Sequence, residues 1–102
     1  ELFFGLSKAN GTDVSDSEFQ KFLDHEVTPR FPDGLTLLAG QGQFKNSNRV
    51  MVKEPSRLLI LFYPIQQGND STRKIEEIRG AYKKMFQQES VLRTDDLSCV
   101  SF

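Results

Sequence analysis

The chain has 102 residues and a mass of 11.7 kDa, which is enough for one small domain. Thirteen basic and 14 acidic residues give a net charge of −1, so we expect no generally basic surface and no nucleic-acid partner. The longest apolar run spans only residues 58–63, which is too short to cross a bilayer. A single cysteine excludes an intrachain disulfide, and no cluster of soft ligands indicates zinc, so we expect neither a metal nor a cofactor.

The first part of the chain predicts a strand followed by a capped helix. Residues 1–7 are rich in Leu and Phe, which is typical of a strand. After a turn cluster, Ser15 and Glu18 form the S-x-x-E pattern of a capping box, in which each side chain pairs with a backbone N–H at the helix start. Apolar residues at helical spacing follow. Pro29 disfavours helical geometry in the residue before it, so we expect the helix to end near Val27.

The rest of the chain predicts two strands, a second helix and a final extended part. Pro55 is expected to break or bend the second of these strands, because proline cannot donate to a ladder. Apolar residues of the second helix fall on one of its faces. The expected ranges are strands over 35–44 and 49–63, a helix over 71–88, and extended segments over 90–94 and 97–102.

This order of elements is typical of a ferredoxin-like α+β fold, written βαββαβ. In that fold a four-stranded antiparallel sheet carries two helices on one face. Right-handed crossovers place the first and third strands in the centre of the sheet, and these two strands contain the densest apolar runs. We therefore expect a single domain over residues 1–102.

Helices on one face would leave the other face of the sheet open, and the alternation of side chains indicates which residues lie there. If Leu58, Ile60 and Phe62 contact the helices, their sequence neighbours lie on the open face, and a register shift of one residue would exchange the two faces. The expected open-face residues are Phe3, Gly5, Ser7, Gln41, Gln43, Arg57, Leu59, Leu61, Tyr63, Cys99 and Ser101.

The apolar members of this open face would form a patch too large to remain in water. A second copy packed sheet to sheet would cover the patch, which predicts a homodimer through the open sheet face. A loop, a segment upstream of residue 1 or a ligand held in a cleft would cover it equally well. The apolar members are Phe3, Leu59, Leu61 and Tyr63.

Two glycines in the strand over 35–44, Gly40 and Gly42, are unusual because glycine weakens a strand. They indicate either a β-bulge or a place where another molecule approaches the backbone. In the second case Gln41, Gln43 and Arg57 would supply the polar contacts of a ligand site.

Arg30 lies in a loop stiffened by Pro29 and Pro32, and a stiff loop positions a side chain well. This arginine either binds an anion or pairs with a local acid, Glu26 or Asp33. The residues that we expect to bind a small ligand, an anion among the candidates, are Arg30, Gln41, Gln43, Arg57 and Tyr63.

The sequence assigns no catalytic residue. His25 falls away from the apolar stripe of its helix, so we expect it to be solvated. Cys99 has no neighbouring base in the sequence and is expected to be buried or inert. Asp95 and Asp96 are expected to interrupt the last strand as a turn, since two carboxylates are too few for a calcium site.

Several strings of the chain resemble a bacterial family called domain of unknown function 3574 (DUF3574). They are ELFFG (1–5), EVTPRFPDGLT (26–36), QESVLR (88–93) and CVSF (99–102). The resemblance covers nearly the whole chain and implies a small exported protein, periplasmic or secreted, with an N-terminal signal segment. Because the chain does not begin with Met, we expect that an upstream segment has been removed. The family carries no established activity, so the resemblance implies no catalytic residue.

Two functions follow from these observations as hypotheses. The first is an exported homodimeric binding or structural module, which the apolar open face favours. The alternative is an enzyme that acts on a small molecule in a cleft at the sheet face, with the five candidate residues as its polar contacts.

Overall fold

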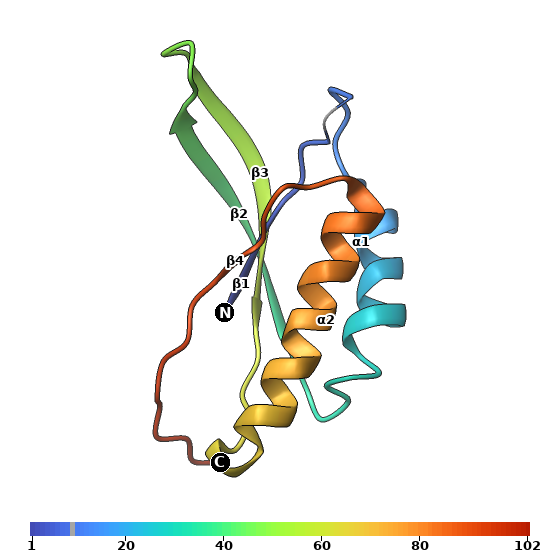
Figure 1. Cartoon of the computed structure of the whole chain (residues 1–102), viewed down its shortest axis with the longest axis vertical. Helices are drawn as coiled ribbons and strands as arrows, with labels where there is room; N and C mark the ends of the chain where they lie inside the picture. The colour runs from blue at the N-terminus through green and yellow to red at the C-terminus, as the bar shows by residue number, and fades with distance from the viewer. Residues whose placement is uncertain (9) are drawn as a thin grey trace.

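The computed structural model describes residues 1–8 and 10–102, and its four strands form one antiparallel sheet in the order β2-β3-β1-β4. The two central strands are those that the sequence predicts. In Figure 1 both helices lie on one side of the sheet, and the C-terminal segment bows out on the other side. The elements in chain order are β1 (Leu2–Gly5), α1 (Asp16–Phe22), the π-helical turn η1 (Leu23–Val27), β2 (Thr36–Lys45), β3 (Met51–Ile60), the 3-10 turn η2 (Ile65–Gln67), α2 (Gly68–Phe86) and β4 (Leu92–Arg93).

The predicted capping box opens α1. The Ser15 side chain accepts a hydrogen bond from the Glu18 N–H, and the Glu18 carboxylate accepts one from the Ser15 N–H, both at 3.1 Å. The helical path ends after Val27, as predicted, but its last turn is widened. There the Thr28 N–H donates to the Leu23 carbonyl at 2.9 Å, five residues back, which is the π-helical pattern.

Strand β3 runs without a break through Pro55, so of the two predicted outcomes, a break or a bend, the break is wrong. The Leu6 N–H donates to the Pro55 carbonyl at 3.0 Å, and an ordinary residue would donate its own N–H back to Leu6. Here the Leu6 carbonyl accepts from Val14 at 2.6 Å instead. The N–H and C=O of one residue point toward the same neighbouring strand, and the carbonyl of Pro55 points toward Leu6. On the opposite side Pro55 lies beside Gln41 of β2, in a pair that exchanges no backbone hydrogen bonds, so the missing N–H costs nothing there.

The glycines of β2 lie in an uninterrupted ladder. Pairing with β3 is continuous along the whole strand, with Gly40 opposite Ser56 and Gly42 opposite Glu54. No bulge occurs there, so the first of the two predicted explanations for these glycines is wrong. A Cβ atom on Gly40 would approach the Ser56 hydroxyl to 3.2 Å, which is a tight contact.

The predicted facing of β3 is also wrong, and so is that of β2, because Gln41 and Gln43 alternate with Leu37 on the helix side of the sheet. Leu59 lies opposite Leu2 and Leu37 and is fully buried against the helices. Leu58 lies opposite Phe3 and therefore points to the open side. The residues that alternate with Leu58 and those that alternate with Leu59 are both apolar, so the sequence pattern alone does not show which of the two rows faces the helices. The facing of β1 is as expected, with Phe3 on the open side.

The core between the sheet and the helices is built on aromatic rings. Phe4 is completely buried, and its ring centroid lies 4.6 Å from that of Tyr82 and 5.5 Å from those of Phe19 and Phe22, all in edge-to-face geometry. The Tyr82 hydroxyl donates to the Gly5 carbonyl, which ties α2 to the end of β1. Burial, reinforced by the negative charge of Glu54, raises the pKa of the Tyr82 hydroxyl.

Two parts extend beyond this core. The β2–β3 hairpin projects past the end of β1, and its outer part (residues 42–54, hereafter the outer hairpin) leans away from the helices in Figure 1. At the other end of the sheet, residues after Arg93 form no strand, so the predicted strand over 97–102 is absent. The radius of gyration is 14.6 Å, against about 12.8 Å for a compact chain of this length.

Candidate functional site

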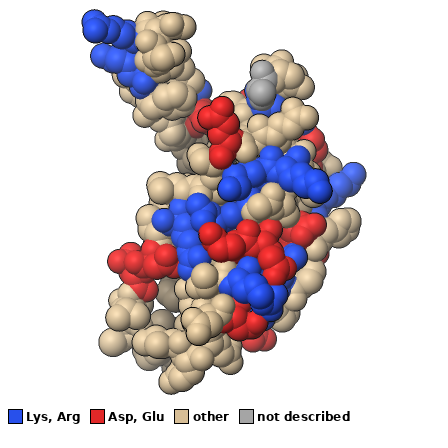
Figure 2. All heavy atoms as spheres, in the orientation of Figure 1, with Lys and Arg blue, Asp and Glu red and all other residues tan. Residues whose placement is uncertain are grey.

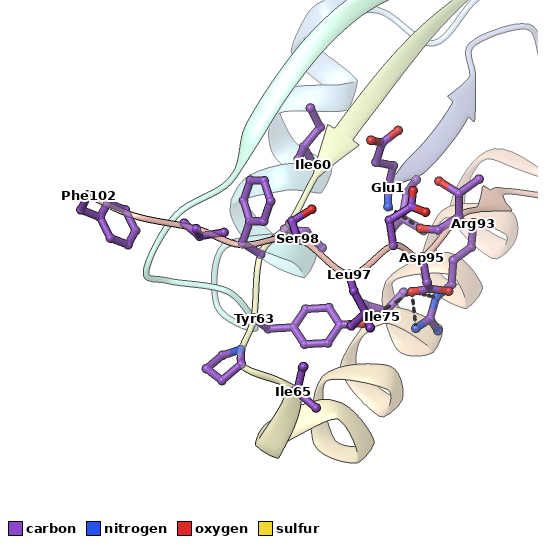
Figure 3. A pocket seen from close by; sticks show the side chains of 17 residues that line it. Glu1, Ile60, Tyr63, Ile65, Ile75, Arg93, Asp95, Leu97, Ser98 and Phe102 are labelled. Atoms are coloured by element: carbon purple, nitrogen blue, oxygen red, sulfur yellow. Dashed lines mark hydrogen bonds and ion pairs between the residues drawn. The ribbon is translucent and has the colours of Figure 1, made fainter.

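A pocket of about 650 Å³ lies at the end of the sheet opposite the hairpin (Figure 3). β1 begins at Leu2, but the chain of β3 continues past Ile60, so residues 61–65 have no strand beside them. The C-terminal segment, which leaves β4 after Arg93, lies across from them and closes the other wall. The pocket therefore results from strands of unequal length and an irregular segment that takes the place of a strand.

Apolar side chains line most of this pocket. Figure 3 shows Tyr63, Ile65 and Leu97 pointing toward one another from the two walls, with Ile75 of α2 behind them. Leu97 lines the pocket and remains 84% exposed. The remaining apolar lining residues are Leu2, Ile60, Leu61, Phe62, Pro64, Val100 and Phe102.

The polar side of the pocket is organised by Arg93. Its guanidinium donates to one oxygen of Asp95 at 3.0 and 3.1 Å, and the Tyr63 hydroxyl lies 3.5 Å from that same oxygen. Arg93 also reaches Glu76 at 3.5 Å and the Thr72 hydroxyl at 3.3 Å, both on α2. The side chain is only 14% exposed. The positive charge of Arg93 is thus fully engaged in holding the C-terminal segment to α2.

The rim of the pocket is acidic. Glu1, Asp95 and Asp96 contribute three carboxylates, whereas Arg93 is the one basic side chain among the pocket-lining residues that the structure describes. The Glu1 nitrogen donates to the Thr94 carbonyl at 2.6 Å, which places the start of the chain beside this segment. An anionic ligand would be repelled here, whereas a neutral or cationic one would not.

Of the five predicted ligand-binding residues, only Tyr63 lines this pocket. Arg30 pairs with the Glu26 carboxylate at 3.0 Å and with Glu77 of α2 at 2.9 Å. Its environment therefore corresponds to the local-acid alternative, with Glu77 in the place of Asp33. The hydrogen bond from Arg30, helped by Arg73, holds the pKa of Glu77 below its usual range.

The other three predicted residues lie toward the opposite end of the sheet. Arg57 pairs with Asp16 at 2.7 Å and so ties β3 to the start of α1. Gln41 and Gln43 stand on exposed positions of β2, opposite Pro55 and Lys53. Arg57 is six residues from Tyr63 along the chain, which is roughly 20 Å in extended conformation. The structure does not gather the five into one site.

Other residues singled out in the sequence have simple surroundings. His25 is exposed, as expected. Cys99 is an exposed free thiol, so of its two expected states, buried or inert, the first is wrong. Within residues 1–8 and 10–102, no three or more His, Cys, Asp or Glu side chains are placed to hold a metal ion. No helix in the described part of the chain has the length and apolar character to span a membrane.

The pocket-lining residues that the sequence did not indicate as site residues include Ile65, Arg93, Asp95 and Leu97. A usable signal was present in Leu97, Val100 and Phe102, three large apolar residues in a tail that lacks other strand features. Nothing in the sequence indicated that Arg93 organises the pocket, because its partners Thr72 and Glu76 are distant in the sequence.

Comparison with known proteins places the chain in a family. The family model described as "Protein of unknown function (DUF3574)" matches residues 1–102, which is the whole chain. The chain belongs to this family. No curated protein matches it.

One solved structure has a similar fold. It is a phage SAM lyase in complex with S-methyl-5'-thioadenosine, and the superposition has a TM-score of 0.65 and a sequence identity of 18%. The match covers 88% of this chain and 72% of the lyase chain. At this identity the similarity establishes a shared fold and nothing about activity.

Proposed function

We propose that this DUF3574 domain binds a small organic molecule in the pocket between residues 60–65 and the C-terminal segment. The observation that carries the proposal is the combination of about 650 Å³ of space, apolar walls and a convergent polar group of Tyr63, Asp95 and Arg93. Ligand sites of this kind are concave, largely apolar and oriented by few polar groups, and they typically enclose 300–1,000 Å³.

The chemistry of the pocket favours a neutral or cationic ligand with an aromatic part. The Tyr63 ring can stack on a heteroaromatic ring, and its hydroxyl and the free edge of the Asp95 carboxylate can bond to ring nitrogens or hydroxyls. An anion, which the sequence had made a candidate, is disfavoured by the carboxylates of the rim.

An adenosine thioether has this chemistry, and the similar phage lyase supports it as the first ligand to test, because that lyase holds S-methyl-5'-thioadenosine. The experiment is isothermal titration of the protein with S-methyl-5'-thioadenosine and, separately, with SAM (S-adenosylmethionine). We expect saturable binding, and a neutral thioether that fails to bind at millimolar concentration would contradict the assignment of the ligand class.

Variants locate the binding in the pocket. Leu97→Ala removes an exposed apolar wall without touching the core, so we expect the dissociation constant to rise about tenfold. Met85→Ala is the matched control, because Met85 is an exposed apolar residue of α2 that does not line this pocket. Equal effects of the two variants would contradict a site at the C-terminal segment.

A catalytic role is the second candidate, and it rests on the same similarity to a lyase. Incubation with SAM, followed by chromatography of the adenosine products, tests it directly. Release of S-methyl-5'-thioadenosine above the spontaneous rate would establish turnover, while binding without turnover would leave the domain as a binding module.

We further propose that the domain forms a homodimer through its open sheet face. Leu38, Leu58, Phe3 and Leu92 stand side by side across all four strands on that face. The accessible surface of the chain is 7260 Å², whereas a compact monomer of this mass exposes about 5,900 Å².

Sedimentation velocity over micromolar to millimolar concentrations tests the homodimer, and a strictly monomeric species throughout would contradict it.

The assignment to the ferredoxin-like βαββαβ class is likewise proposed, supported by the order of the elements and of the strands in the sheet. Export of the protein stays a prediction, to be tested by fractionating cells that express the full-length gene product.

A further inference from the structure

The outer edge of β2 presents backbone groups that pair with no residue that the structure describes. β2 is the terminal strand of the sheet and is paired with β3. The carbonyl of Pro55 points toward Leu6, so Gln41, which lies opposite Pro55, turns its own N–H and C=O away from the sheet. The same holds for every second residue of the strand. The residues whose backbone groups face outward are Leu37, Ala39, Gln41 and Gln43.

This edge has none of the features that usually keep other strands away. Exposed edges are typically short, charged, bulged or interrupted by proline. β4, at the other edge of the sheet, has only two residues, whereas β2 has ten. Residues 36–44 include no charged residue and no proline, and their pairing with β3 has no bulge. The edge of β2 is therefore a template to which another strand can add.

The outer hairpin has little support from the rest of the chain. Figure 2 shows it standing clear of the body of the molecule, with basic side chains at its end. Gln41 and Gln43 are exposed although they alternate with Leu37 on the helix side, so the helices do not reach over this part of β2. A two-stranded ribbon is only marginally stable by itself in water. A further strand beside β2 would therefore stabilise the outer hairpin.

A second copy of β2 can supply that strand in a self-complementary register. Two antiparallel strands related by a two-fold axis exchange backbone hydrogen bonds where the outward-facing residues of one lie opposite the outward-facing residues of the other. With the axis at Gln41, Gln41 lies opposite the partner's Gln41, and Gln43 lies opposite the partner's Ala39. All these residues face outward, so the two edges are matched along the strand.

The side chains on the open side favour the same register. With the axis at Gln41, Leu38 lies opposite the partner's Phe44. In the single chain these two side chains are 49% and 50% exposed, and each would cover the other. An axis at Gly40 would instead place Leu38 opposite the partner's Gly42, and the apolar contact would be lost.

This register also supports the outer hairpin. Residues 42–45 of each copy lie opposite residues 37–40 of the other, the part of β2 that is nearest the core. The one charged side chain of β2, Lys45, lies opposite the partner's Leu37, so no like charges meet across the seam. A second copy thus matches the edge in its hydrogen bonds, its apolar contacts and its charge.

We propose that two copies of this chain join edge to edge through β2, antiparallel and with the axis at Gln41, into one sheet with four strands from each copy. The inference is independent of the ligand pocket, which lies at the other end of the sheet. It is also separate from the proposed contact through the open face. The open faces of the two copies become one surface, so a protein that uses both contacts forms a tetramer.

Amide hydrogen exchange, measured by NMR in a dilute and a concentrated sample, tests the edge directly. The amides of Ala39, Gln41 and Gln43 face outward, and we expect them to exchange at least tenfold more slowly in the concentrated sample. The amides of Gly40 and Gly42 face β3 and provide the internal comparison. A protein that stays monomeric, or one that associates while the outward-facing amides remain unprotected, would overturn the inference.

Gln43→Pro removes an N–H that faces outward and leaves the bonds to β3 intact, which is a position where edge strands tolerate proline. We expect sedimentation velocity to show association at least tenfold weaker than in the unchanged protein, while circular dichroism verifies that the variant folds. Undiminished association of the folded variant would contradict pairing through β2.

A pair of charged variants, Gln41→Lys and Gln41→Glu, tests the position of the axis without changing the backbone. Residue 41 lies opposite itself, so like charges meet in each variant alone, and we expect association about fivefold weaker at low salt. In the equimolar mixture a lysine meets a glutamate, and association is expected to return to that of the unchanged protein. Gln66→Lys is the control for net charge, because Gln66 is exposed in η2, outside β2. A mixture as weak as its components, or an equal effect of Gln66→Lys, would overturn the inference.

Discussion

The two faces of the sheet are made of the same strands and have opposite surroundings. On the helix side, the row through Leu59 and Leu2 is buried, and Phe4 beside it is surrounded by aromatic rings. The adjacent row, through Leu58 and Phe3, faces the open side, where Phe3 is 36% exposed. Both rows are apolar, so the difference between core and contact surface comes from which row the helices cover and not from composition.

The comparison is sharpest at two adjacent phenylalanines. Phe4→Ala removes a completely buried ring, and we expect a loss of about 3–5 kcal/mol in the free energy of unfolding. Phe3→Ala changes a ring that remains 36% exposed on the open side, so in dilute, monomeric protein we expect a smaller loss, of about 1–2 kcal/mol. Urea denaturation of both variants provides the measurement. Similar losses would contradict the assignment of the two faces.

Tyr82→Phe tests the helix side of the sheet with a smaller change in the side chain. The variant keeps the buried ring but leaves the partly buried Gly5 carbonyl without the hydrogen bond from the tyrosine hydroxyl. We expect a loss of about 1–3 kcal/mol in the free energy of unfolding. Chemical denaturation near neutral pH is suitable, because the raised pKa of Tyr82 keeps the hydroxyl protonated there. A variant as stable as the unchanged protein would show that this hydrogen bond contributes nothing.

Leu58→Ser tests the open side. The substitution makes the centre of the exposed row polar, and we expect the dissociation constant of the proposed homodimer to rise about tenfold. Leu37→Ser is the informative contrast, because Leu37 lies opposite the buried Leu59 and its loss should reduce stability more than association. Sedimentation and urea denaturation of both variants separate the two effects. The reverse pattern would mean that the faces are assigned wrongly.

The smallest expected effect concerns the charged outer surface of the helices. The pKa of Glu77 is lowered chiefly by the hydrogen bond from Arg30. A carboxyl group with a lowered pKa in the folded state stabilises the fold above its ordinary pKa, and this contribution is lost as the pH falls through the folded-state value. Glu77→Gln is therefore expected to lower the melting temperature slightly at pH 7 and not at pH 2.

Glu89→Gln is the control for that experiment, because Glu89 is exposed and pairs with no cation that the structure describes. Thermal melts of the two variants and the unchanged protein at both pH values provide the comparison. If Glu77→Gln destabilised the protein equally at pH 7 and pH 2, an ion pair with Arg30 would not be the cause.

Local patterns in the sequence predicted the elements well. The capping box of Ser15 and Glu18 opens α1, and the end of the helical path near Val27 follows from Pro29. The apolar density of β1 and β3 predicted their central positions. These features depend on neighbours within a few residues, which the sequence displays directly.

Long-range features were not predictable in the same way. Pro55 was expected to interrupt β3, but the Val14 N–H satisfies the Leu6 carbonyl that proline cannot serve. The facing of β3 was ambiguous because Leu58 and Leu59 begin two equally apolar alternating sets. The pocket depends on an irregular tail that has no periodicity, so only Tyr63 among its residues was anticipated.

We propose that the pocket at the end of the sheet, and not the helix side, receives a ligand. Amide chemical-shift mapping during titration with S-methyl-5'-thioadenosine tests this claim most directly. We expect saturable changes concentrated in residues 61–65 and 94–98, with α1 unaffected. Changes centred on α1 and the outer face of α2, or no changes at millimolar ligand, would contradict it.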